Sequence, residues 1–189
     1  MQVSKKVLYS VIGLLIVLVG AYYFMTGTTS SGKIVVFETS KGIIEIQLAS
    51  DMPVTTGNFE KLVGQGFYDG TRFHRVIEGF MVQGGDPLTK DTGKSRMWGT
   101  GGPGYTIRDE FSQNNSNARG TISMANAGSN TGGSQFFINV VDNSFLNGKH
   151  PVFGKVVKGM DVVDAIMSVE TDAQDKPLQD ILIVKASLK

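Results

Sequence analysis

The stretch FHRVIEGFMVQGGD, residues 73–86, carries most of the information about the fold. Two short apolar runs lie inside it, at residues 73–77 and 80–83. Between them, Glu78 and Gly79 form a pair that favours a tight turn. Successive side chains of a strand point to opposite faces, so Arg75 shares a face with its apolar neighbours two residues away, and His74 lies on the other. The stretch therefore predicts a β-hairpin that places an arginine among apolar side chains.

Short apolar runs of the same kind recur along the chain, at residues 33–38, 43–48, 121–125, 136–141, 152–157 and 181–188. A further strand is expected near residues 105–107, inside a Gly-rich and polar stretch at 84–117 that otherwise resembles a loop. Helical spacing occurs twice, in a segment that opens at Pro53 and in residues 159–169. Many short strands with two helices, which do not alternate, predict an all-β barrel or sandwich.

The composition excludes several classes of protein. The chain has 189 residues, which favours a single domain, and it contains no cysteine, so disulfides, thiolate–zinc sites and cysteine nucleophiles are excluded. Two histidines leave little for a histidine-rich metal site. Apart from Lys5 and Lys6, the 16 remaining basic residues nearly balance 17 acidic ones, which argues against a nucleic-acid partner. We expect no metal and no cofactor.

The N-terminal segment is apolar enough to predict a membrane anchor. Residues 7–25 carry no charge and, as a helix, would reach about 28 Å, close to the ~30 Å hydrocarbon core of a bilayer. Lys5 and Lys6 precede the segment, and Tyr22, Tyr23 and Phe24 lie at its far end, in agreement with the positive-inside rule and the aromatic belt. A cleaved signal peptide is the alternative, which would leave a secreted or periplasmic protein.

These features predict four parts of the chain. They are a cytoplasmic N-terminus at residues 1–6, a transmembrane helix or signal anchor at 7–25, a linker at 26–32 and a folded domain at 33–189. The predicted protein is therefore single-pass and membrane-anchored, with its folded domain on the extracytoplasmic side.

One formal motif match does not carry a function. Residues 99–104, GTGGPG, fit the GxGxxG pattern of dinucleotide-binding folds. That reading needs a helix that opens inside the motif, whereas Pro103 and Gly104 lead into the extended run at 105–107. A glycine-rich loop is the better interpretation.

Two further segments combine apolar and amide side chains with tight turns. They read SMANAGSNTGGSQFFI at residues 123–138 and FLNGKHPVFGKV at residues 145–156. Together with residues 73–86, they match in order and spacing the pattern of the cyclophilins, which are peptidyl-prolyl cis–trans isomerases. The chain resembles this family over about residues 33–187. The resemblance implies a closed, eight-stranded antiparallel barrel capped by two helices, whereas the strand pattern alone does not reach closure.

The resemblance also implies the site residues. The catalytic arginine of the family falls on Arg75. The pocket for the proline ring falls on Phe80, Met81, Phe137, Leu146 and His150. Contacts to the substrate backbone fall on Gln83, Ala125, Asn126 and Gln135. Taken singly, each apolar side chain here would be read as core packing and Arg75 as half of a surface ion pair.

Phe145 is a departure from the family pattern. Many members carry tryptophan at this position, where it contacts the inhibitor cyclosporin. Phenylalanine keeps the apolar wall but lacks the indole N–H donor. We therefore expect weakened cyclosporin binding and a smaller effect on catalysis.

The residues suit the chemistry that the resemblance implies. Rotation about an X-Pro bond crosses a barrier of roughly 18–20 kcal/mol and breaks no bond, so neither a nucleophile nor a metal is required. The twisted amide nitrogen regains a lone pair, to which an arginine N–H can donate. We therefore expect a monomeric isomerase that acts on proline-containing polypeptides and assists protein folding outside the cytoplasm. The alternative is a catalytically idle module that only binds such segments.

Overall fold

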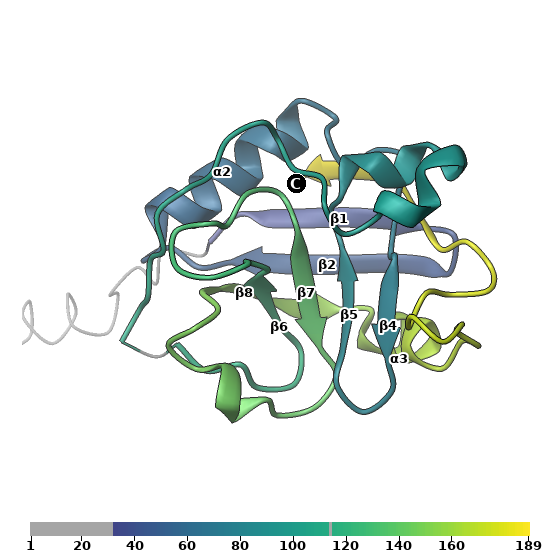
Figure 1. Ribbon diagram of the computed structural model, residues 1–189. Coiled ribbons are helices and arrows are strands. Elements are labelled where there is room, and N and C mark those ends of the chain that lie inside the picture. The colour runs from purple at the N-terminus through teal and green to yellow at the C-terminus, as the bar shows by residue number, and fades with distance from the viewer. Residues whose placement is uncertain (1–31, 114) are drawn as a thin grey trace, which may run out of the picture. The chain divides into compact units, whose positions relative to one another are not determined.

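The computed structural model describes residues 32–113 and 115–189 (Figure 1). They lie in one compact unit, Gly32–Lys189, to which every element described below belongs.

A single antiparallel sheet forms the body of this unit, in the order β3-β9-β1-β2-β8-β6-β7-β5-β4. Its strands are β1 (Ile34–Thr39), β2 (Gly42–Leu48), β3 (Thr71–Arg72), β4 (Arg75–Ile77), β5 (Met81–Gly84), β6 (Thr121–Met124), β7 (Phe136–Asn139), β8 (Val152–Lys158) and β9 (Leu182–Leu188). The all-β class predicted from the short apolar runs is confirmed.

The two ends of the sheet are joined by the chain itself. β3 and β4 lie at opposite ends of the strand order, yet only Phe73 and His74 separate them. The Phe73 N–H donates to Ile181 O at 2.9 Å, and the His74 N–H donates to Gln83 O at 3.0 Å. The segment therefore leaves β9 and joins β5 in one bend, and the sheet curls until its ends meet. If β3 and β4 are counted as one bent strand, the sheet has the eight strands that the family resemblance implies.

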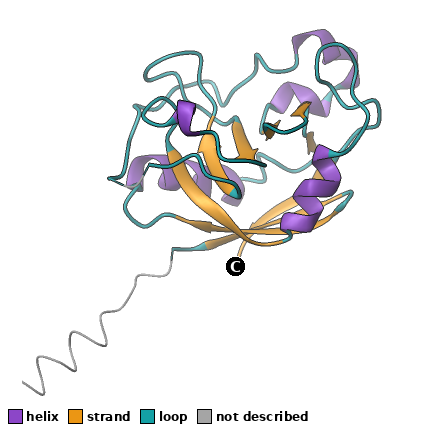
Figure 2. Cartoon of the chain, turned by 90° about the horizontal axis from the view of Figure 1, so that it is seen from below, coloured by secondary structure: helices purple, strands orange, loops and turns teal. Residues whose placement is uncertain are grey.

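Two α-helices pack on opposite sides of the curled sheet (Figures 1 and 2). Helix α2 (Pro53–Gly64) begins at a proline, whose missing N–H costs nothing in the first turn. Its N-cap residue, Met52, offers no side-chain hydrogen bond. Instead Glu110, more than fifty residues away, accepts the Val54 and Thr55 N–H groups on Oε2, each at 3.0 Å. A carboxylate at this end also suits the positive pole of the helix dipole.

Helix α3 (Met160–Met167) buries Val163 and Ile166 against the sheet. Gly159 precedes it with φ = 86°, a left-handed conformation that a side chain strains. A Cβ atom there would also lie 2.1 Å from Ile43 O on β2. The glycine thus lets the chain turn from β8 into α3 while it lies directly on the sheet.

Aromatic rings fill the interior of the curled sheet. Phe37, Phe59, Tyr68, Phe136 and Phe153 are fully buried, and their ring centroids lie 4.9–6.3 Å apart in the contacting pairs. The Tyr68 hydroxyl donates to Ser134 O at 3.1 Å, so its polar end is satisfied inside the core. Burial raises the pKa of Tyr68 well above its ordinary value.

The stretch at 84–117 departs from the loop that was predicted. It contains two 3₁₀ helices, η1 (Pro87–Lys90) and η2 (Thr92–Met97), which begin after the side-chain caps Asp86 and Asp91. The strand predicted near residues 105–107 is reduced to one bridge between Ile107 and Gly132. The Asp86 and Asp91 caps, with Pro87 in the first turn, favour the two 3₁₀ helices. The glycines at 99–104 favour turns over continuous strand pairing.

The predicted localisation, a single-pass membrane protein with its folded domain on the extracytoplasmic side, is corrected. Helices α2 and α3 have 12 and 8 residues, and they reach about 18 and 12 Å, well short of the ~30 Å of a hydrocarbon core. No helix in the described part of the chain is long and apolar enough to cross a bilayer. The anchor predicted at residues 7–25 lies outside the described residues. We therefore propose neither the membrane attachment nor the secreted or periplasmic alternative for this chain.

The cap from Glu110 predicts a measurable stability effect. Glu110→Ala should lower the free energy of unfolding by about 1–2 kcal/mol, because two N–H groups of α2 lose their acceptor. Glu110→Gln should lose less, since an amide oxygen still accepts. Urea unfolding of the full chain measures the difference, with Glu78→Ala as a control at an exposed turn. If Glu110→Ala and Glu78→Ala cost the same, Glu110 does not cap the helix.

Candidate functional site

A cavity of about 210 Å³ opens beside the hairpin that residues 73–86 form. Its lining comes from β4, β5 and the turn between them, from β7, and from the loops that follow β6 and β7. The lining residues are Arg75, Phe80, Met81, Gln83, Ala125, Asn126, Phe137, Leu146 and His150. Three segments that are far apart in the sequence thus meet in one place. Of the predicted catalytic and substrate-binding residues, only Gln135 is absent from this cavity, and it lies next to it.

The hairpin β4–β5 positions the one charged side chain of the cavity. Arg75 pairs with Gln83 across the two strands, so both side chains leave the sheet on the same side. The Arg75 side chain is 45% exposed, and its Nε lies 3.4 Å from Oδ2 of Asp175. Arg75 therefore combines solvent contact with a nearby counter-charge.

The apolar floor of the cavity is separate from the main core. Met81, Phe137 and Leu146 are buried and form a cluster of their own, against which Phe80 and Ala125 pack. Met81 and Phe137 lie on the faces of β5 and β7 that the aromatic core does not use. Leu146 comes from the 3₁₀ helix η3 (Ser144–Leu146). The result is an apolar cup with an arginine at its rim.

His150 completes the wall of the cup. Its ring meets the edge of Phe137 at a centroid distance of 5.4 Å and an interplanar angle of 77°. Its Nδ1 lies 3.1 Å from Met124 O. Because a carbonyl oxygen only accepts, Nδ1 carries the proton, and in the neutral ring Nε2 is an acceptor.

Phe145, the predicted inhibitor-contact position, lies at the rim rather than in the floor. Its side chain is 61% exposed and stacks on Phe80, with ring centroids 5.7 Å apart at 25°. An aromatic ring at this exposed position extends the apolar surface of the cup toward solvent.

A ladder of amide hydrogen bonds supports the opposite side. Gln83 Nε2 donates to Gln135 Oε1 at 2.9 Å, and Gln135 Nε2 donates to Gly99 O and Gly101 O at 2.9 and 2.8 Å. The loop that carries these two carbonyls is held in turn by Asp86. The fully buried Asp86 carboxylate accepts the N–H groups of Leu88, Gly99 and Gly101.

Gly101 must be glycine for this arrangement, because a Cβ atom there would lie 2.1 Å from Oδ1 of Asp86. Packing against a buried carboxylate thus explains the middle glycine of the GxGxxG match. A second hollow of about 500 Å³ lies beyond Gln135, between this loop and residues 125–127.

The side chain of Asn126 is engaged at both ends of its amide, once with the loop that precedes β8 and once within its own loop. Its Nδ2 donates to Lys149 O at 2.9 Å, and its Oδ1 accepts the Gly128 N–H at 3.2 Å. Within residues 32–113 and 115–189, the main-chain N–H and C=O of Asn126 have no hydrogen-bond partner. They are available to an extended peptide.

Sequence reasoning did not assign roles to Asp86, Asp175 and His74. Asp86 ends the motif at 73–86, but nothing local shows that it binds a loop more than ten residues away. Asp175 reaches Arg75 from a hundred residues away. No group of three or more His, Asp or Glu side chains in the described residues could hold a metal ion.

His74 is buried behind the amide ladder, and neither of its ring nitrogens has a hydrogen-bond partner within the described residues. Burial is the largest influence and lowers the pKa of His74, while the nearby Asp86 carboxylate opposes this shift. The folded state therefore keeps His74 neutral.

Comparison with known proteins shows what the chain as a whole is similar to. A family model described as "Cyclophilin type peptidyl-prolyl cis-trans isomerase/CLD" matches residues 34–188. Human peptidyl-prolyl cis-trans isomerase-like 1 is 41% identical over 154 residues, which cover 80% of this chain and 90% of that protein. Peptidyl-prolyl cis-trans isomerase CYP71 of Arabidopsis thaliana is 46% identical over 165 residues, but these are 25% of its length. The chain thus spans about a quarter of that relative.

Solved structures agree with the sequence comparison. The crystal structure of a cyclophilin type peptidyl-prolyl cis-trans isomerase from Cryptosporidium parvum matches with a TM-score of 0.75 at 34% identity, over 83% of this chain and 97% of that one. A second structure of that protein, in the presence of the dipeptide Ala-Pro, matches with a TM-score of 0.74.

The buried histidine predicts a pH dependence of stability. An unfolded chain protonates His74 near pH 6.5, whereas the folded state resists protonation because the pKa is lowered. The stabilisation is therefore complete above pH 6.5 and is lost as the pH falls toward the folded pKa. Between pH 7 and pH 5, the free energy of unfolding should fall more steeply for the parent than for His74→Gln. Urea unfolding at several pH values measures the two slopes, and equal slopes would contradict the prediction.

Proposed function

Because the chain belongs to the cyclophilin-type peptidyl-prolyl cis–trans isomerases, we propose that it accelerates rotation about X-Pro bonds through Arg75, with the proline ring held in the apolar cup. The observation that carries the proposal is the meeting of one arginine with an apolar cavity of about 210 Å³, a size that suits a single proline ring with its neighbouring atoms. The relative from Cryptosporidium parvum was crystallised in the presence of Ala-Pro. Proline-containing polypeptides are therefore the substrates that we propose for this chain.

The apolar cup supplies binding and orientation. Met81, Phe137 and Leu146 would contact the faces of the pyrrolidine ring, which has no polar atom to satisfy. With the ring held, only the chain that precedes proline needs to rotate. The same contacts exclude water from the amide, so an N–H donor meets less competition there.

Arg75 supplies the step that lowers the barrier. In the planar amide the proline nitrogen shares its lone pair with the carbonyl and accepts no hydrogen bond, whereas the twisted amide regains a pyramidal nitrogen with a free lone pair. A guanidinium N–H directed at this nitrogen stabilises the twisted state more than either planar isomer, and this difference accelerates the reaction. A 10⁵-fold acceleration would require about 7 kcal/mol, to which binding-derived orientation also contributes.

The amide groups around the cup would hold the substrate backbone. Gln83 uses Nε2 to bind Gln135, which leaves its Oε1 to accept a substrate N–H. The main chain of Asn126 can pair with an extended segment, much as an added strand pairs with a sheet edge. Ala125 gives its N–H to Gln135 O at 3.0 Å, so the loop and the ladder keep one geometry. These contacts would align the substrate backbone beside the cup, so that the amide bond before proline rotates within reach of Arg75.

All of these residues come from residues 33–189 of one chain, so we propose that this range is the catalytic unit and that a monomer is sufficient. Acceleration of X-Pro exchange would assist proteins whose folding waits for proline isomerisation, which takes tens of seconds or longer without a catalyst.

The role of Arg75 predicts a selective loss of activity. Arg75→Ala should reduce kcat/KM on an Ala-Pro peptide by about a hundredfold or more, because the transition state loses a charged donor. NMR exchange spectroscopy with the full chain measures the cis–trans rate, and Arg96→Ala on the exposed η2 helix is the matched control. If the parent binds the peptide without accelerating exchange, the chain is a binding module and Arg75 is a recognition residue.

The exposed ring at position 145 predicts altered inhibitor binding. Phe145→Trp adds an indole N–H at the rim of the cup, and we expect it to tighten cyclosporin binding by about tenfold, the value of one hydrogen bond near 1.4 kcal/mol. Calorimetric titration of both proteins measures the change. Phe111→Trp adds the same ring at an exposed position outside the cavity and should leave the affinity unchanged. Equal affinities for the parent and Phe145→Trp would show that position 145 does not contact the inhibitor.

A further inference from the structure

We infer that Asp175 is a positioning residue for the isomerisation, which orients the Arg75 guanidinium through Nε and leaves its terminal nitrogens free for the substrate amide. The inference rests on the proposed role of Arg75. It concerns the segment at residues 170–180, which joins α3 to β9 and lies outside the three motifs of the sequence analysis.

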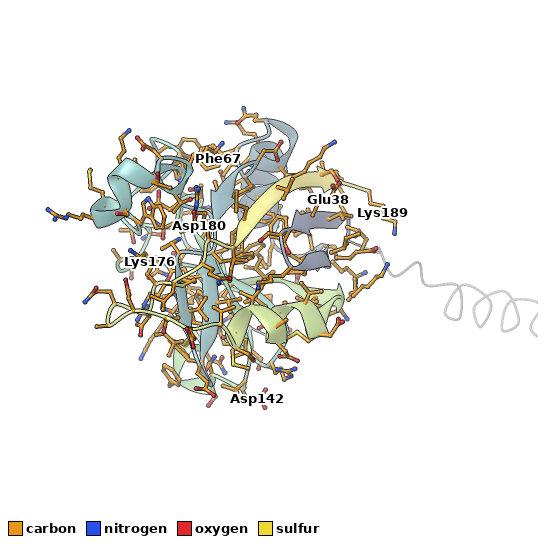
Figure 3. All side chains as sticks on the ribbon, turned by 90° about the vertical axis from the view of Figure 1, so that its right-hand side faces the viewer. Glu38, Phe67, Asp142, Lys176, Asp180 and Lys189 are labelled. Carbon is orange, nitrogen blue, oxygen red and sulfur yellow. The ribbon has the colours of Figure 1, made fainter. Side chains whose placement is uncertain are left out.

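The 170–180 segment runs along the strand that carries Arg75. The Val76 N–H donates to Asp175 O at 2.8 Å, and Arg72 pairs with Asp180 at 2.8 Å. Figure 3 shows Lys176 and Asp180 on this segment as it leads toward β9. Because β4 is the last strand of the sheet, its outer edge would otherwise expose unpaired backbone groups. The segment therefore supports the outer edge of the strand on which Arg75 lies.

Asp175 contacts this strand with two groups at once. Its carbonyl accepts from Val76, and its carboxylate Oδ2 lies 3.4 Å from the Nε of the adjacent Arg75. Within the described residues, no other protein group meets the Arg75 guanidinium at hydrogen-bond distance. A contact at Nε restricts rotation of the guanidinium plane while both terminal nitrogens keep their N–H donors.

The backbone of Asp175 is in an unusual conformation. Its φ is 63°, in the left-handed region where glycine is the relaxed choice and aspartate is tolerated. Strained positions of this kind persist where the surrounding structure determines them. Here a turn with its own hydrogen bonds fixes the backbone conformation of Asp175. These hydrogen bonds do not involve the Asp175 carboxylate.

Asp172 builds that turn. Its Oδ1 accepts the N–H groups of Gln174 and Lys176 at 2.9 and 3.0 Å, and its own N–H donates to Lys176 O at 2.8 Å. The backbone hydrogen bond from Lys176 is the largest influence that lowers the pKa of Asp172, and the one from Gln174 adds to it. Lys176 also lies over the Trp98 ring, 5.8 Å from its centroid, and Arg72 lies 5.6 Å from the same centroid. The turn is thus anchored independently of Arg75.

This separation makes Asp175 testable without disturbing the fold. Asp175→Gly removes the carboxylate, relaxes the backbone and keeps the carbonyl that binds Val76. Asp175→Asn keeps an oxygen that can accept from Nε and tolerates the left-handed conformation. Asp164→Ala is the matched control, because Asp164 also pairs with an arginine, Arg119, at 2.8 Å, but outside the cavity.

NMR exchange with the full chain and an Ala-Pro peptide gives kcat and KM for each variant. We expect Asp175→Gly to lower kcat by about threefold, the size that a half-exposed ion pair supports, with KM changed by less than about twofold. Asp175→Asn should recover part of the loss, and Asp164→Ala should match the parent. The melting temperature of Asp175→Gly should equal or exceed that of the parent. The Arg75 Nε–H resonance, assigned by its absence in Arg75→Lys, should shift and exchange faster with solvent in Asp175→Gly.

A double variant separates the two proposals. If Asp175 acts through Arg75, Asp175→Gly should change nothing further in an Arg75→Ala background. The positioning role is overturned if Asp175→Gly leaves kcat unchanged or raises it. It is also overturned if Asp175→Gly lowers kcat by the same factor in the Arg75→Ala background as in the parent. Activity that survives Arg75→Ala alone overturns the proposed function of Arg75 instead.

Discussion

Closure of the sheet by residues 71–77 is the constraint on which the rest of the structure depends. This segment pairs with β9 at one end and with β5 at the other, so it belongs to both edges of the curled sheet. A shift of one residue in the pairing of β4 with β5 would move Arg75 to the opposite face, because strand side chains alternate. The hydrogen bonds of Phe73 and His74 on the two sides of the bend fix the register. The position of Arg75 is therefore a consequence of closing the sheet.

The cavity exists because β5 and β7 bury both of their faces. On one face Val82, Phe136 and Ile138 belong to the aromatic core, and on the other Met81 and Phe137 form the floor of the cup. A strand covered on both faces is mainly apolar, and Gln83 on β5 and Asn139 on β7 are the polar exceptions here. The apolar residues make these runs easy to recognise in the sequence. The sequence does not show which of these apolar side chains enter the core and which line the cup, because nothing within FFIN at Phe136–Asn139 distinguishes a core ring from a pocket ring. Only the curl of the sheet separates them.

Local patterns predicted the hairpin, both helices and most strands, since each depends on residues close in the sequence. Closure and the assembly of the pocket came from the family resemblance, because spacing alone does not show which strands meet. The features that no local pattern indicated act over long separations. Glu110 caps a helix that starts at Pro53, and Asp86 binds the glycine loop at 99–101. The sequence does not indicate which backbone N–H groups a loop carboxylate will accept hydrogen bonds from.

The distribution of polar groups suits a reaction that moves no protons. Gln135 and Asn126 are engaged through both ends of their amides, and His150 is held through Nδ1, so their geometry does not need to change during the reaction. Arg75 differs from them, because its side chain is 45% exposed and its contact with Asp175 is a single one at 3.4 Å. The lone pair of a twisted amide has a direction, so a donor aimed at it must be oriented as well as charged. If Arg75 is the donor, as we propose, the contact of its guanidinium with Asp175 is therefore the point at which the protein can adjust the rate.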